Sequence, residues 1–74
     1  MEFFVCTSGY IGDVFLDGNN QGRNKDMTGQ LLVKQCNEGP HLIKLKCLNG
    51  INYPAKSVNI AGTDPIAPAQ VPFP

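Results

Sequence analysis

The sequence contains no tryptophan, and only 16% of its 74 residues are charged. Six basic and six acidic residues balance, and neither kind forms a run. Nucleic-acid-binding domains usually carry a basic patch or stripe; the nearest approach to one here is Lys44 and Lys46, with Lys34 near them. We interpret these lysines as a solvated sheet face, so the sequence predicts no nucleic-acid partner.

Long apolar runs are missing too. No stretch approaches the roughly 20 apolar residues of a membrane-spanning helix, so we expect no membrane insertion. Residues 1–6 carry Glu2 where a secretory signal has basic residues, and their apolar run is too short for such a signal. Either the chain is a whole protein that is not exported by that route, or it is an excised piece of a longer one. The sequence does not determine the final location of the protein, which could be a surface or a virus particle.

The three cysteines are an odd number, which leaves at least one thiol free and favours a reducing site of synthesis. Cys36, His41 and Cys47 superficially suggest a metal site. However, six residues along one strand span about 20 Å, whereas ligands of one zinc ion each lie about 2 Å from it. We therefore predict no metal and no cofactor, and interpret the thiols as small buried hydrophobic groups.

Two polar groups suggest other chemistry. Cys36 and His41 flank one turn and could form a nucleophile pair, but we expect the His41 ring to bond a turn carbonyl instead. Asp17 lies near Asn19 and Asn20, but calcium needs six or more oxygen ligands. We expect Asp17 to bond its own turn backbone.

Turn residues separate the short apolar segments. We predict strands at residues 3–6, 13–16, 30–36 and 42–48, and a fifth strand that Pro54 interrupts and that resumes through Val58 and Ile60. Residues 18–22 and 23–29 are predicted loops, and residues 49–50 a type I′ hairpin turn. The turn-forming residues are Asp17, Gly18, Gly22, Gly39, Asn49 and Gly50. The third and fourth strands are expected to pair with Val33 opposite Leu45, which would put Cys36 and Cys47 on opposite faces. These two cysteines would then not bond to each other, while a disulfide from Cys6 stays open.

The fold class that follows is all-β: a small antiparallel β-sandwich of about five to six strands with an extended Pro-rich C-terminal arm. We expect a sandwich domain over residues 1–61 and the arm over residues 62–74. The arm is expected to form neither a sheet strand nor a helix. It has no charged side chain after Asp64, yet it carries Ile66, Val71 and Phe73.

These three side chains are poorly suited to a solvated tail. We expect them to dock across a subunit boundary; the alternative is that the arm folds back and covers an edge strand of its own domain.

Residues 12–60 contain a series of short motifs: Val14-x-Leu16-Asp17-Gly18 followed by Gly22, Gly39-Pro40-His41-x-Ile43-x-Leu45, Gly50 and Tyr53, and Val58-x-Ile60. In these motifs residues 12–60 resemble the PEGA domain family. Arg23-Asn24 stands where the family usually has Thr-Pro. The resemblance implies a small β-sandwich-like unit in a binding or structural context, and no catalytic residues.

A single domain of this length has a narrow stability margin, which small proteins commonly widen with disulfides, a metal or a partner. We therefore predict a non-enzymatic structural or protein-interaction module, a subunit or accessory part of a larger assembly such as a surface layer, filament or virus particle. Its partner would be itself or neighbouring subunits. The alternative is a ligand-binding or inhibitory module that acts through residues 17–29, and a small thiol enzyme is a distant third.

Overall fold

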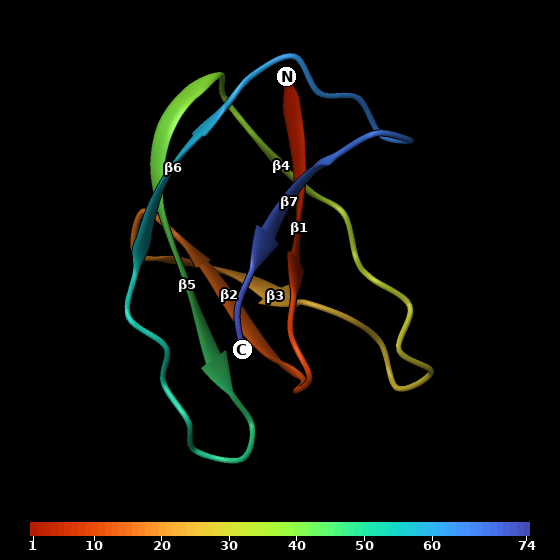
Figure 1. The fold of residues 1–74 in the computed structure, drawn as a ribbon, viewed down its shortest axis with the longest axis vertical. Coiled ribbons are helices and arrows are strands. Elements are labelled where there is room, and N and C mark those ends of the chain that lie inside the picture. The colour runs from red at the N-terminus through yellow and green to blue at the C-terminus, as the bar shows by residue number, and fades with distance from the viewer.

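The computed structural model describes residues 1–74, which fold into strands and connections without a helix. The fold is all-β, as the sequence predicts, but it has more strands than expected. The strands in Figure 1 are β1 (Glu2–Thr7), β2 (Gly12–Leu16), β3 (Asn19–Arg23), β4 (Lys34–Cys36), β5 (Gly39–Cys47), β6 (Lys56–Ile60) and β7 (Ala69–Pro72).

The strands form two sheets. One has three strands in the order β4-β1-β7, and the other has four in the order β3-β2-β5-β6. All pairings are antiparallel except that of β1 with β7, whose arrows point the same way in Figure 1. The expectation of a purely antiparallel fold is therefore wrong at this pair.

Both sheets contribute to one core through the period-2 alternation of their strands. In β5, Ile43, Leu45 and Cys47 are buried, while the intervening Lys44 and Lys46 are exposed. Successive side chains of a strand point to opposite faces, so this pattern gives β5 one core face and one solvent face. The buried core cluster consists of Phe4, Cys6, Val14, Cys36, Ile43, Leu45, Cys47, Ile60, Val71 and Phe73.

Residues 18–22 were expected to form a loop, but residues 19–23 form β3. Leu16 pairs with Asn19, so Asp17 and Gly18 alone make the turn between β2 and β3. Both have positive φ, 50° and 86°, which is the geometry of a type I′ hairpin turn. The polar sequence conceals this strand because all five of its residues are exposed.

The third predicted strand is shorter and pairs elsewhere. Only Lys34–Cys36 is strand, and it pairs with β1 rather than β5, because β2 and β6 occupy both edges of β5. The register with Val33 opposite Leu45 is therefore wrong. The inference that Cys36 and Cys47 lie on opposite faces fails with it, since both thiols belong to the core cluster.

The turn after β5 also differs from the expected type I′. Gly50 has a φ of 94°, but Asn49 does not have positive φ. The Gly50 amide donates to the Cys47 carbonyl (3.1 Å) and the Cys47 amide donates to the Ile51 carbonyl (2.8 Å). The connection is therefore a three-residue turn that ends in a left-handed glycine.

The C-terminal segment contains a strand, contrary to expectation. β7 pairs in parallel with β1, with Cys6 opposite Val71, and Pro72 ends the strand. Proline is tolerated here because β7 lies at the edge of its sheet. Val71 and Phe73 are buried in the core of their own chain, whereas Ile66 is 94% exposed. Of the three predicted interaction residues, only Ile66 is free to contact another molecule.

Candidate functional site

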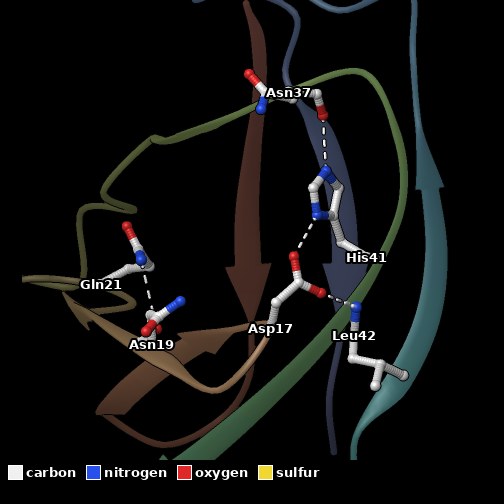
Figure 2. A network of polar contacts seen from close by, with 6 residues as sticks. All are labelled: Asp17, Asn19, Gln21, Asn37, His41 and Leu42. Atoms are coloured by element: carbon white, nitrogen blue, oxygen red, sulfur yellow. Dashed lines mark hydrogen bonds and ion pairs between the residues drawn. The ribbon is translucent and has the colours of Figure 1, made fainter.

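A polar network joins the β2–β3 turn to the start of β5 (Figure 2). The Asp17 Oδ2 atom lies 2.6 Å from His41 Nδ1, and Asp17 Oδ1 accepts a hydrogen bond from the Leu42 amide at 2.9 Å. The second ring nitrogen of His41, Nε2, lies 2.7 Å from the Asn37 carbonyl oxygen. The expected bond of His41 to a turn carbonyl is confirmed, whereas Asp17 bonds to β5 rather than to its own turn.

This network favours the doubly protonated form of His41. A carbonyl oxygen and an ionised carboxylate can only accept, so each ring nitrogen donates its hydrogen bond when it carries a proton. The hydrogen bond to Asp17 accordingly raises the pKa of His41, and that to Asn37 adds to the effect. The same His41 bond, followed by that of the Leu42 amide, lowers the pKa of Asp17. A general base needs a free nitrogen lone pair, and the engaged ring of His41 offers none.

The three cysteines are free and buried. Burial raises the pKa of Cys6 to about 12, and burial is also the main reason why the pKa values of Cys36 and Cys47 are raised. Reactive thiols have lowered pKa values in electropositive, partly exposed surroundings. These thiols lie in the opposite kind of environment and pack as apolar groups.

Asn24 is a residue whose importance the sequence did not indicate. Its side chain is fully buried, and its Oδ1 accepts a hydrogen bond from the Gly12 amide at 2.9 Å. Its Nδ2 group donates to the carbonyls of Tyr10 (3.1 Å) and Cys6 (3.4 Å). Asn24 thus joins β1, the start of β2 and the loop after β3. Its position in a predicted polar loop gave no sign of burial.

The four-stranded sheet has a face that points to solvent. We call it the outer face and define it by the outward side chains Asp13 and Phe15 of β2, Arg23 of β3, and Leu42, Lys44 and Lys46 of β5. The register sets Phe15 opposite Lys44 and Asp13 opposite Lys46. Leu42 is 55% exposed and stands one outward position along β5 from Lys44.

Charge and apolar surface are combined on the outer face. The Lys44 ammonium lies 5.2 Å from the centroid of the Phe15 ring, within the range of a cation–π contact. Arg23 forms an ion pair with Asp13, which leaves Lys44 and Lys46 without a carboxylate partner. The outer face is therefore a small apolar patch with positive charge beside it.

The predicted turn residues serve the scaffold. Gly18, Gly22, Gly39 and Gly50 have positive φ, as does Asp17, whereas Asn49 does not.

The chain contains no pocket, no cluster of three or more potential metal ligands, and no helix that is long and apolar enough to cross a membrane. Comparison with protein-family models, curated proteins and solved structures finds no match to this chain.

Proposed function

We propose that this chain is a non-enzymatic structural or protein-interaction module that works as a subunit or accessory part of a larger assembly, such as a surface layer, filament or virus particle. The observation that carries the proposal is the outer face, where Phe15 and the 55% exposed Leu42 lie beside two lysines without a carboxylate partner. Exposed apolar surface with a polar rim is typical of protein interaction sites.

The chemistry of the polar and thiol groups supports a non-enzymatic role. Both nitrogens of the single histidine are engaged, and the thiols are buried with raised pKa values. We further propose that the two sheets form a β-sandwich of the PEGA type, which the sequence motifs of residues 12–60 favour.

A second candidate function is ligand binding or inhibition through residues 17–29. The observation in its favour is that β3 is exposed along its whole length and lies at the edge of its sheet. Such an edge offers unpaired backbone groups to an added strand of a partner.

The particle mass in solution tests the assembly proposal. We expect the mass of the wild-type chain, measured by sedimentation over a wide concentration range, to rise above that of one chain. Leu42→Asp should shift this rise to higher concentration, because it puts a carboxylate into the apolar part of the outer face. A mass that stays at one chain throughout would contradict the proposal.

A further inference from the structure

One exposed turn carries an apolar side chain at its tip. Asp64 and Ala67 form a closed turn, in which the Ala67 amide donates to the Asp64 carbonyl at 3.1 Å. The Asp64 carboxylate also accepts from the amides of Ile66 (3.0 Å) and Ala67 (2.7 Å). These bonds hold the backbone of Ile66, whose side chain is 94% exposed. Ile66 is therefore presented to solvent by an ordered turn.

The surroundings of this turn are acidic. The Thr63 amide and hydroxyl both donate to the Glu2 carboxylate, which keeps the turn beside the start of β1. Glu2 pairs with Cys36, so Glu38 follows close by on the same end of the molecule. No lysine or arginine occurs in residues 1–2, 37–40 or 60–66, and the amino group of Met1 is the positive group beside Glu2. We call this region the acidic end and define it by Glu2, Glu38, Asp64 and Ile66.

The outer face has the complementary composition. It holds three of the six basic side chains and one of the six acidic ones. With His41 left out, the acidic and basic side chains of the chain balance, so the remaining surface holds five acidic side chains and three basic ones. The basic excess of the outer face is thus matched by an acidic excess elsewhere on the molecule, and complementary patches of this kind favour specific association.

We infer that the acidic end of one copy of this chain docks on the outer face of a second copy, with Ile66 against Phe15 and Leu42. In this arrangement Glu38 and Asp64 face Lys44 and Lys46 of the second copy. The inference deepens the proposed assembly function and rests on it.

The positions of the two surfaces on the molecule determine what kind of assembly this contact would build. In Figure 1 the connection between β6 and β7 lies at the upper right, whereas β2 and β5 lie to the left and below. The two surfaces are different, and one copy can use both at once. A contact between unlike surfaces is heterologous, so it builds open chains or rings rather than closed two-fold dimers.

The test uses one variant of each surface. Leu42→Asp disables the outer face and leaves the acidic end intact, whereas Ile66→Asp disables the acidic end and leaves the outer face intact. Each variant alone should associate about tenfold more weakly or worse than the wild type, as expected for loss of a central apolar anchor. Mixed in equal amounts, the two variants should form dimers and nothing larger, since one intact contact remains in the mixture.

Controls separate the contact from folding and from general exposure. Met27 is 90% exposed in another loop, so Met27→Asp is a matched control and should associate like the wild type. If Leu42→Asp does not fold, Leu42→Ser and Ile66→Ser provide the same comparison. Raising the salt concentration from about 0.1 to 1 M should weaken association, because the screening length falls from about 10 to about 3 Å.

The outcomes distinguish this contact from the proposed function. If the wild type associates but neither variant changes its mass, or if the mixture gives no dimers, the head-to-tail contact is wrong and an assembly through other surfaces stands. If the wild type remains a single chain at every concentration, both the contact and the proposed assembly function are wrong.

Discussion

Asp17 and His41 make the stability of the β2–β3 turn depend on pH in two directions. The pKa of His41 is raised in the fold, so its contribution is fully present below its unfolded pKa and is lost as pH rises through the folded value. The pKa of Asp17 is lowered, so its contribution is present above its unfolded pKa and is lost as pH falls through the folded value. The pair is therefore most stabilising between the unfolded pKa of Asp17 and the unfolded pKa of His41.

The first prediction is that Asp17→Asn lowers the pKa of His41. The variant removes the negative partner of Nδ1, which is the main cause of the raised value. The measurement is an NMR titration of the His41 ring protons in both proteins. A titration midpoint that is unchanged in Asp17→Asn would show that the ion pair is absent in solution.

Asn24 carries the second prediction at this scale. Asn24→Ala leaves the Gly12 amide and the carbonyls of Cys6 and Tyr10 without their side-chain partner. A buried unsatisfied polar group costs about 1–3 kcal/mol, so we expect a loss of about 3 kcal/mol in the free energy of unfolding. Urea denaturation measures it.

A matched control is Asn59→Ala, which alters an exposed asparagine in β6. It should change stability by no more than about 0.5 kcal/mol. Equal effects of the two substitutions would mean that the network around Asn24 does not form.

At the scale of elements, the turn after β5 depends on Gly50. Its φ of 94° is strained for any residue with a side chain, although no atom lies within 4 Å of an added Cβ. We predict that Gly50→Val destabilises the protein by about 1–3 kcal/mol, measured by urea denaturation. Gly9 has neither positive φ nor a neighbour within 4 Å, so Gly9→Ala should be nearly neutral. A Gly50→Val variant as stable as the wild type would contradict the turn geometry.

The strand β7 and its flanking residues give the next prediction. Phe73 is buried in the chain's own core, so Phe73→Ala should cost about 3–5 kcal/mol at any protein concentration. Ile66→Ala should leave the stability of the single chain within about 0.5 kcal/mol of the wild type. Thermal melts at low and high protein concentration test both. If the cost of Phe73→Ala appeared only at high concentration, Phe73 would instead act between copies.

Strands with a clear alternation were predictable. Residues 42–48 show alternating apolar and charged side chains, and the structure buries Ile43, Leu45 and Cys47 there as predicted. β3 was missed because all of its residues are polar and exposed. β7 was missed because four prolines in residues 65–74 indicate irregular backbone. Neither the parallel pairing of β7 nor the partner of β4 follows from a local pattern, because both join distant parts of the chain.

The polar network was predictable only in part. The contact of His41 with a turn carbonyl could be predicted because Asn37 and His41 are four positions apart and flank the same turn. The contact of Asp17 with His41 joins residues 24 positions apart and depends on the pairing of β2 with β5. The sequence around Asn24 does not distinguish it from other loop asparagines. Its burial depends on three backbone groups that only the fold brings to its side chain.

At the scale of the whole molecule, the small hydrophobic core and the separation of charge between two surfaces both favour the proposed association of copies of the chain. Thirteen of the 74 residues are buried, so the hydrophobic core is small, as is usual for a short domain. A partner that binds only the folded state adds to its stability by mass action. Contact between the outer face and the acidic end would therefore stabilise each copy as concentration rises.

The most direct measurement of this behaviour is the amide NMR spectrum recorded at low and high protein concentration. We expect concentration-dependent shifts at two separate places, around Phe15, Leu42 and Lys44 on the outer face and around Ile66 at the acidic end. The loop around Met27 should not shift. Spectra that do not change with concentration, or shifts confined to the Met27 loop, would contradict the claim that these two surfaces join copies of the chain.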